Sequence, residues 1–557
     1  MRVLTLGSAA LILLVVVGLP VAWLVIGGFR GPTGPTLEFY RLAFTSPENY
    51  RVLLNTLQIS VSVAIMSTLI GVPMAWLVGR TDMPGRRAIW TLVNVAYTTP
   101  PFLMAIAYVM LLGPNAGLIN RGIRAAFGLA EPPFNIFSMG GMVFVITLYV
   151  FPFVFLMVAG ALESLDPGLE QSAQILGAGR LRTLSFVTLP MVTPAILSGA
   201  LLAFVDSLAL FGPQAVLGVP AQIHTVQTKI YTLFSYPPRY GLASALAMNL
   251  VVVTVLALYL QQRFLGQRSY ITMTGKGAPL YRVSLGIWRV PSLLLCGIVF
   301  LFSVGLPYLI LLGVSFSRQW ATVLESGNLT LKNYTYALFE FSLTRQAILN
   351  SLGLAAAAAT LAMTVGTLIA YLDLRTSFVG RRALDYLSLV PLGLPGIVLS
   401  VGLIQAWIRP PLVIYGTIWI LLVAYMARYI PFAVRSANAS LRQMDPALEE
   451  AARITGAPWL TSLLSVTIPL IKRGMFSGWL LIFVPALREL SASILLFTSG
   501  SETIAVAIFQ LYEEGYLESV CALAVVTLVV SLSVLAIARK LAGPSAWELP
   551  SKQSGGG

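Results

Sequence analysis

Charged residues are scarce in this chain, and their scarcity excludes most classes of soluble protein. Only 10% of the 557 residues are Asp, Glu, Lys or Arg, whereas 57% are hydrophobic. Soluble globular domains are nearer to a quarter charged, so this composition predicts a protein of the lipid bilayer. The net charge of +14 is not gathered in one solvent-exposed basic face, and we therefore expect no nucleic-acid partner.

Cysteine and histidine are almost absent. Cys296 and Cys521 lie inside apolar runs and His224 is the only histidine, which excludes a disulfide framework and a cysteine–histidine metal cluster. The sequence also has no GxxxxGK[ST] phosphate loop, no HExxH pair and no nucleophile elbow. We therefore expect no catalytic site, no ATP hydrolysis by this chain, no cofactor and no resident metal.

Long apolar runs are abundant instead. Each is long enough, at about 20 residues, to cross roughly 30 Å of hydrocarbon as a helix. The runs are 5–28, 55–79, 88–112, 139–162, 191–216, 242–262, 290–315, 350–373, 383–408, 412–434, 474–497 and 518–538. The sequence therefore predicts an all-α membrane protein with about twelve transmembrane helices.

Basic residues indicate the orientation of these helices. With the N-terminus in the cytoplasm, 22 of the 35 Lys and Arg residues fall in cytoplasmic connectors and ends, and 11 fall outside. The remaining two, Arg428 and Arg488, lie in spans. This bias follows the positive-inside rule, so we expect both termini in the cytoplasm.

The chain repeats itself after six spans. Residues 55–57 (NTL) match 350–352 (NSL) at an offset of 295, and 151–153 (FPF) match 430–432 (IPF) at an offset of 279. A fixed register over this length indicates duplication, and six spans per copy make the two repeats parallel. The expected organisation is a first half at 1–265 with a polar loop at 163–190, a cytoplasmic linker at 266–289, a second half at 290–542 with a polar loop at 436–473, and a disordered tail at 543–557.

Each polar loop contains a short helix of unusual composition. Asp166 and Asp445 are suited to be N-caps and each precedes a proline, while Gly177 and Gly456 are placed to end the helices. Between them lie small and acidic residues. A helix lying on anionic lipid favours large apolar and basic residues instead, so the composition favours docking to another protein.

The second of these loops resembles a known motif. Glu450-Ala451-Ala452, followed by Gly456 and by Pro469 after an apolar stretch, is similar to the EAA motif of ABC importer permeases. That resemblance implies the type I importer architecture, with each loop helix inserted into a subunit of an ATPase dimer that binds ATP and Mg. The residues implied to take part in this coupling are Glu170, Gln171, Ala173, Gly177, Glu449, Glu450, Ala451, Ala452 and Gly456.

The first loop departs from the motif, with Gln171-Ser172-Ala173 in place of Glu-Ala-Ala. Equal contributions from the two loops are therefore not implied.

The fusion of two such units in one chain resembles most closely the ferric iron permeases. Phe211-Gly212-Pro213 in the first half and Arg488-Glu489 in the second carry this resemblance. It implies a bacterial inner-membrane protein that receives ferric iron from a periplasmic binding protein. Fused permeases for thiamine and for aminoethylphosphonate have the same outline, so these and other small solutes remain open.

An ion-driven carrier is the alternative from another class. Such carriers also often have twelve spans in parallel repeats. They would not need two docking helices of this composition, and we therefore favour the ATP-driven importer.

Charges in the fifth span of each half are candidate pathway residues. Asp206 lies in the first half, and Arg488 and Glu489 lie in the second. Ionisable groups in membrane helices usually face the bundle interior or water, so one interpretation is that these residues, with Phe211, line the pathway. The alternative is a packing contact between Arg488 and Glu489, with Asp206 capping a break in its helix.

Pro152 and Pro431 occupy equivalent positions in the middle of two spans. A proline there removes a backbone hydrogen bond and permits a kink. They are candidate gate hinges, and ordinary kinks that set the shape of the helix are the alternative.

Overall fold

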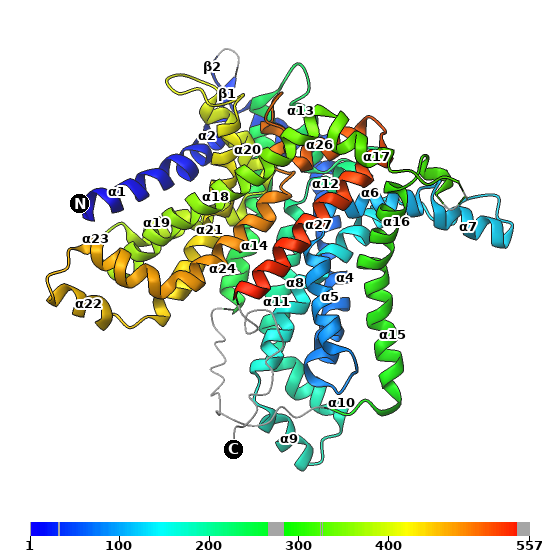
Figure 1. Cartoon of the computed structure of the whole chain (residues 1–557), viewed down its shortest axis with the longest axis horizontal. Coiled ribbons are helices and arrows are strands. Elements are labelled where there is room, and N and C mark those ends of the chain that lie inside the picture. Colours follow the sequence, from blue (N-terminus) through cyan, green and yellow to red (C-terminus); the bar gives the residue numbers. More distant parts are fainter. Residues whose placement is uncertain (1, 32–33, 266–282, 324, 326, 543–557) are drawn as a thin grey trace. The chain divides into compact units, whose positions relative to one another are not determined.

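The computed structural model describes residues 2–31, 34–265, 283–323, 325 and 327–542 (Figure 1). Most residues in these ranges are helical. Two short strands in them, β1 (Arg30–Gly31) and β2 (Gly34–Pro35), pair with each other in antiparallel orientation. The predicted tail at 543–557 and residues 266–282 of the predicted linker lie outside the described residues.

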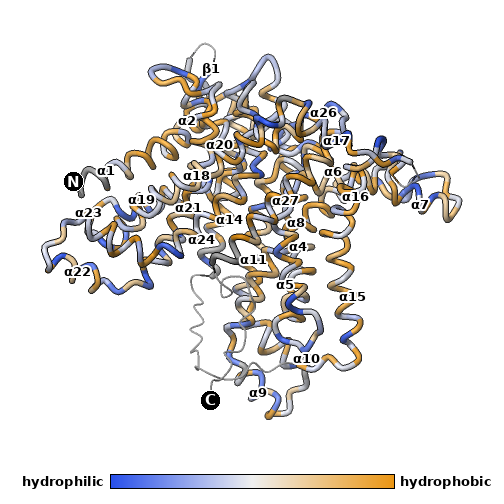
Figure 2. The backbone as a smooth tube through the Cα atoms, in the orientation of Figure 1, coloured by the Kyte–Doolittle hydropathy of each residue, from blue (hydrophilic) through white to orange (hydrophobic). Residues whose placement is uncertain are grey.

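The predicted all-α membrane fold is confirmed. Ten helices in the described ranges are long and apolar enough to cross a bilayer, and two further spans are broken helix pairs. Figure 2 shows the hydrophobic colouring along these helices. The ten unbroken spans are Leu6–Gly27, Pro47–Arg80, Met139–Ser164, Leu184–Ala209, Tyr240–Leu260, Gly286–Ser315, Leu343–Arg375, Ile418–Gln443, Trp459–Leu487 and Leu517–Val534.

Prolines break the other two spans. In the first half, α5 (Arg86–Thr98) is followed by Pro100 and then by α6 (Pro101–Leu112) at an angle of 96°. In the second half, Pro395 separates Arg381–Gly393 from α20 (Gly396–Trp407) at 116°. Proline has no backbone N–H and forces the residue before it out of the helical conformation. These two apolar runs, 88–112 and 383–408, are continuous in the sequence but sharply bent in the structure.

The chain folds into two compact units that do not coincide with the two sequence halves. Unit 1 contains the described residues of Met1–Arg51, Val226–Val251 and Leu312–Trp547, and unit 2 contains those of Val52–Thr225 and Val252–Leu311. The first helix of each sequence half thus belongs to the unit built mainly from the other half. Sequence repetition shows which segments share an origin, and it carries no information about which segments pack together.

In unit 2 the core is formed by three long helices. They are α4 (Pro47–Arg80) from Val52 onward, α8 (Met139–Ser164) and α11 (Leu189–Ala209). Gly71 and Gly199 both lie against Val154, where an added Cβ would meet its atoms at 2.9 Å. These glycines permit the close approach of α4 and α11 to α8. The other helices of this unit are α5, α6, α7 (Leu118–Phe127), α9 (Pro167–Ile175), α10 (Arg180–Thr183), η2 (Leu184–Thr188), α12 (Gly212–Gly218), α14 (Tyr240–Leu265) from Val252 onward, η3 (Gly286–Trp288), α15 (Arg289–Phe300), η4 (Leu301–Gly305) and the start of α16 (Leu306–Ser315).

Unit 1 repeats this core with α18 (Ser342–Arg375), α21 (Ile418–Gln443) and α24 (Ile468–Leu487). Gly366 and Gly478 are the counterparts of the two glycines above, and Gly366 lies against Ala433. The same small residues therefore set the same helix spacing in both units. The other helices of this unit are α1 (Arg2–Leu13), η1 (Leu14–Gly18), α2 (Leu19–Gly27), α3 (Glu38–Thr45), α13 (Val226–Leu233), η5 (Trp320–Thr322), α17 (Lys332–Thr335), η6 (Tyr336–Glu340), α19 (Arg381–Leu389), η7 (Val390–Gly393), α20, α22 (Ala447–Ile454), α23 (Trp459–Ser462), η8 (Leu463–Thr467), α25 (Ser493–Leu496), α26 (Ile504–Glu513) and α27 (Leu517–Ala542).

Candidate functional site

Helix α9 is the first of the two predicted docking helices. Asp166 caps it, since its Oδ1 accepts a hydrogen bond from the Gly168 N–H at 2.9 Å, which satisfies an amide left open at the helix start. Gly177 ends it with a φ of +85°, a left-handed conformation that glycine adopts without a steric cost. The predicted N-cap and the predicted stop are both confirmed.

Helix α22 is its counterpart in the second half. The Oδ1 of Asp445 accepts from the Ala447 N–H at 2.9 Å, and Gly456 has a φ of +83°. The helix itself begins at Ala447, so Pro446 stands at the N-cap and not at the predicted first helical position. The capping carboxylate is nonetheless used in the same way in both loops.

The first-turn carboxylate of α9 is buried. Glu170 is 4% exposed, and its Oε1 accepts a hydrogen bond from the Thr188 hydroxyl at 2.6 Å. Its Oε2 lies 4.0 Å from Nη1 of Arg80, the last residue of α4. Arg80 is itself buried and donates from Nη2 to the Leu165 carbonyl at 2.9 Å. Glu170 therefore ties the docking helix to the end of one long span and the start of another.

Glu449 has the same position in α22 and is also buried. Its Oε1 accepts from the Thr467 hydroxyl at 3.1 Å and lies 3.7 Å from Nε of Arg375, the last residue of α18. Its Oε2 accepts from the Tyr371 hydroxyl at 3.1 Å and lies 3.5 Å from Nη2 of Arg453. The second docking helix is thus held to its span by more contacts than the first.

The two clusters are related by the internal repeat. The arginines are 295 residues apart, and the glutamates and threonines are 279 apart, which are the offsets that align the two halves. We call them the first joint (Arg80, Glu170 and Thr188) and the second joint (Arg375, Glu449 and Thr467). The arginines were overlooked in the sequence, although each is a basic residue that ends an apolar span at the same place in the repeat.

The additional contacts of the second joint have no counterpart in the first. Trp76 stands where Tyr371 would be, and Gln174 stands where Arg453 would be. Neither a hydroxyl nor a cation is therefore available at those two places to the carboxylate of Glu170. The two docking helices differ in how firmly they are attached as well as in their motif residues.

The outer faces of the docking helices carry the remaining predicted coupling residues. Gln171, Gly177, Glu450, Ala451 and Gly456 are exposed, and Ala173 and Ala452 are half-exposed. Large apolar side chains accompany them: Ile175 is 85% exposed and Ile454 is 86% exposed. Exposed apolar side chains beside polar ones are typical of a surface that binds another protein. The structure thus separates inward carboxylates from outward contact residues, and the role of each in coupling remains a prediction.

A separate polar cluster surrounds Glu489 between α24 and α25. Its Oε2 lies 2.9 Å from Nε of Arg428 and accepts from the Tyr429 hydroxyl at 2.6 Å. Its Oε1 accepts from the Ala492 N–H at 3.0 Å. The ion pair of Glu489 is therefore with Arg428 on α21, not with the adjacent Arg488. This arrangement supports the packing interpretation, with a different cation from the one expected.

The other predicted pathway residues lie close to helix ends. Asp206 is half-buried near the end of α11, Phe211 is fully buried at the start of α12, and Arg488 is 8% exposed just after α24. Leu210 holds in the first half the position of Glu489, so the polar cluster belongs to one half alone. A role of these residues in a pathway remains a prediction.

Pro152 and Pro431 lie inside α8 and α21, both buried. The helices continue through them, as the sequence predicted. Their use as gate hinges remains a prediction. In the ranges that the structure describes, no group of three or more His, Cys, Asp or Glu side chains is arranged to hold a metal ion.

The sequence profile of the family described as "Binding-protein-dependent transport system inner membrane component" matches this chain twice, at residues 67–268 and 362–543. The two matches together cover more than half of the chain. Each includes one of the docking helices and the joint glutamate on it.

Several transport permeases are similar to this chain, two of them over most of its length. The putative ferric transport system permease protein FbpB 1 of Haemophilus influenzae is 31% identical, covering 81% of this chain and 71% of that protein. The ferric transport system permease protein FbpB of Actinobacillus pleuropneumoniae is 28% identical, covering 87% of this chain and 70% of its own length. The molybdenum transport system permease protein ModB of Escherichia coli is 30% identical over 40% of this chain and 95% of that protein.

Among solved structures, a bacterial ABC transporter involved in the import of the acidic polysaccharide alginate has a chain that is 23% identical, with a TM-score of 0.36. The match covers 44% of this chain and 88% of that one. The two profile matches and the similarity to full-length permeases identify the family of the chain. It belongs to the binding-protein-dependent transport system inner membrane components, joins two copies of their domain, and is a membrane permease of an ABC importer.

Proposed function

We propose that this chain forms the translocation pathway of an ATP-driven importer for ferric iron and is moved by a separate ATPase dimer. The observation that carries the proposal is the pair of joints. Each docking helix presents an exposed face outward and is fixed by a buried carboxylate to the long span behind it. A partner that grips both faces can therefore move both long spans.

The proposed mechanism is alternating access. An ATPase dimer that binds ATP and Mg closes and displaces α9 and α22 together. The joints pass this displacement to α4 and α18, because a buried arginine–carboxylate contact is costly to break. The pathway then opens to the other side of the membrane, and the solute crosses without a covalent step in this chain.

The assignment of ferric iron is supported by the full-length relatives. Both relatives named above as ferric transport permeases are similar over more than 80% of this chain. Similarity to the molybdenum permease and to a putative 2-aminoethylphosphonate permease of Salmonella paratyphi A spans 40% and 46% of it. The fused arrangement thus favours iron over those solutes.

The polar cluster around Glu489 is not arranged to hold iron tightly. Ferric iron is a hard cation that prefers oxygen ligands. Both oxygens of Glu489 are already engaged, by Arg428 and Tyr429 on one side and by the Ala492 N–H on the other. We propose that tight iron binding resides in a periplasmic binding protein, and that this chain holds no resident metal.

We also propose that both termini and both docking helices face the cytoplasm of the bacterial inner membrane. The excess of Lys and Arg in the connectors on that side supports this orientation. It also places the docking helices on the side where ATP is available.

The test is uptake by the complete system in proteoliposomes. The permease, its ATPase and its binding protein are reconstituted together, and accumulation of radiolabelled ferric iron is measured with and without ATP. We expect ATP-dependent accumulation that thiamine, molybdate and aminoethylphosphonate do not compete away. Uptake that persists without ATP and follows an imposed proton or sodium gradient would instead show an ion-driven carrier.

A further inference from the structure

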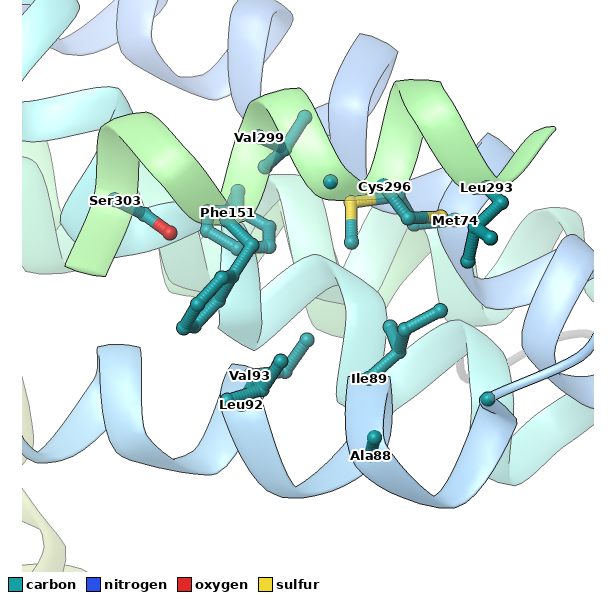
Figure 3. Close-up of a pocket in the computed structure, with 13 residues that line it drawn as sticks. Met74, Ala88, Ile89, Leu92, Val93, Phe151, Leu293, Cys296, Val299 and Ser303 are labelled. Atoms are coloured by element: carbon teal, nitrogen blue, oxygen red, sulfur yellow. The ribbon is translucent and has the colours of Figure 1, made fainter. Parts of the chain in front are cut away.

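A narrow apolar cavity lies in unit 2 between α15 and the helices α4, α5 and α8 (Figure 3). Its volume is about 190 Å³. Leu293 and Cys296 line it from α15, Ile89 and Val93 line it from α5, and Phe151 closes it from α8. A cavity with such walls does not hold water well, so its natural occupant is apolar.

The cavity is elongated along α15. Its lining residues run from Leu293 on α15 to Ser303 on η4, which continues this helix, and ten residues of helix correspond to about 15 Å at 1.5 Å per residue. A slot of this length along a membrane-spanning helix matches an extended hydrocarbon chain better than a compact solute.

The slot is open to its surroundings along one side. Ala88 on α5 and Leu293 and Gly297 on α15 all line it, and all three are exposed. In a bilayer the material next to a membrane-spanning helix is lipid acyl chain. A lipid chain can therefore enter the slot sideways, without passage through the protein.

Basic residues stand at one end of the slot. Gly85 lines the cavity, and Arg86 and Arg87 follow it directly at the start of α5. Arg87 is exposed and Arg86 is half-buried. Two guanidinium groups beside a helix N-terminus suit a phosphate, and basic pockets between spans on the cytoplasmic side are suited to lipid head groups.

We propose that this slot binds one acyl chain of an anionic phospholipid, with the lipid phosphate held at Arg86 and Arg87. The apolar walls alone give no preference over the bilayer, because lipid tails are as apolar as leucine side chains. The preference for this position therefore comes from the charge of the head group. The orientation proposed above assigns the lipid to the cytoplasmic leaflet, and lipid binding itself does not depend on transport.

The second half supplies a matched comparison. Arg381 and Arg382 are the counterparts of the two arginines, and Leu387 is the counterpart of the cavity residue Leu92. In unit 1, Leu387 reaches to 3.9 Å from where a Cβ on Gly18 would lie. The helix that contains Gly18, η1, thus packs against α19 at this point.

The test measures retained lipid by native mass spectrometry. The purified complex is stripped of lipid in detergent and then titrated with equal amounts of phosphatidylglycerol and phosphatidylcholine of the same chain length. We expect one phosphatidylglycerol to bind with clear preference. The double variant Arg86→Gln, Arg87→Gln should bind it roughly 25-fold more weakly if each basic residue contributes about fivefold, whereas Arg381→Gln, Arg382→Gln should leave it unchanged.

A second pair of variants tests the slot itself. Leu293→Trp fills the cavity, while Leu294→Trp adds the same ring to a neighbour that does not line it. The first should weaken the binding of phosphatidylglycerol, because its acyl chain can no longer lie in the slot, and the second should not. Equal binding of the two lipids by the wild type, or equal effects of the two tryptophans, would overturn the proposal and leave only a nonspecific lipid belt. Because the readout is binding, a failed transport assay would not affect this outcome.

Discussion

Arg80 Nη1 and Glu170 Oε2 lie 4.0 Å apart, with side chains that are 1% and 5% exposed. Arg80 ends a long span and Glu170 belongs to a loop helix, so the contact joins two elements that a flexible connection would leave independent. Two opposite charges at this depth compensate each other, whereas either one alone would remain buried and unpaired. The first joint should therefore be sensitive to the loss of one partner and tolerant of the loss of both.

Removal of one partner from the first joint should destabilise the protein strongly. Arg80→Met is expected to cost about 3–5 kcal/mol, because it leaves the Glu170 carboxylate buried without its cation. The double variant Arg80→Met, Glu170→Met should recover most of that loss, because apolar side chains of similar volume tolerate the same site. Thermal unfolding of the wild type, both single variants and the double variant in detergent measures the coupling. Arg87→Met changes an exposed arginine and is the control. Strictly additive effects of Arg80→Met and Glu170→Met in the double variant would contradict the pairing.

The second joint should depend on its additional hydrogen bond. Tyr371→Phe removes the hydroxyl that donates to Glu449 Oε2 and keeps the ring, so we expect a loss of about 1.5–3 kcal/mol, as for a hydrogen bond to a charged group. Arg453→Gln should cost less than about 1 kcal/mol, because the Arg453 side chain is 43% exposed and ion pairs exposed to solvent are weak. Unfolding in detergent compares the two variants, with the exposed Tyr386→Phe as control. A larger effect at Arg453 than at Tyr371 would contradict this ranking.

The outward face of α22 should control coupling without controlling stability. Glu450 is exposed whereas its neighbour Glu449 is buried. Glu450→Lys combined with Gly456→Asp is therefore expected to abolish ATP-dependent uptake, with only the small loss of stability that a residue other than glycine at a φ of +83° entails.

The measurement pairs uptake with ATP hydrolysis in the same proteoliposomes. Gly456→Asp alone is the control for strain in the loop, and the unfolding temperature is recorded for each variant. Unimpaired uptake by the double variant would show that this face does not contact the motor.

The sequence predicted the caps, the stops and the repeat because these are local features. An aspartate before a proline favours the start of a helix, and a glycine eleven residues later favours its end, in any protein. Asp166 and Gly177 behave accordingly. Twelve apolar runs predict spans for the same reason, since length and hydropathy are read directly from the chain.

Contacts between distant segments could not be predicted in this way. No local pattern shows that Glu489 pairs with Arg428, 61 residues earlier, and not with its neighbour Arg488. Nor does one show that the helix beginning at Arg289 packs with the first half. Equal offsets of 295 at Arg80 and Arg375, and of 279 at the two joint glutamates, were present in the sequence. They point to a shared architecture only once the contacts between each arginine and its glutamate are known.

The cluster around Glu489 should behave as a packing device. Tyr429→Phe removes one donor to the carboxylate and is expected to destabilise by about 1.5–3 kcal/mol, while Arg428→Gln leaves the buried carboxylate without its cation and should cost about 3–5 kcal/mol. If the cluster only fixes packing, both variants lower the unfolding temperature and keep the competition profile of uptake unchanged. Altered competition by other solutes at an unchanged unfolding temperature would instead place Glu489 in the pathway.

The connection that leads into α15 is fixed to the first half by an acid-sensitive contact. The Val283 N–H donates to the Arg80 carbonyl at 2.9 Å, the Leu285 N–H donates to Asp82 Oδ1 at 2.9 Å, and the Arg289 side chain pairs with Asp82 Oδ2. The hydrogen bonds from Arg289 and from the Leu285 N–H lower the pKa of Asp82 to about 2. An aspartate in an unfolded chain has a pKa of about 3.9.

Because the folded pKa is the lower of the two, the contact stabilises the protein fully above about pH 4 and loses its effect as the pH falls toward 2. Asp82→Asn should therefore lower the unfolding temperature by a constant amount between about pH 5 and pH 8, with a difference from the wild type that shrinks below about pH 4. Arg289→Gln should show the same pH dependence, because it removes the other partner of the pair. A difference that grows as the solution is acidified would mean that Asp82 has no such contact in the folded protein.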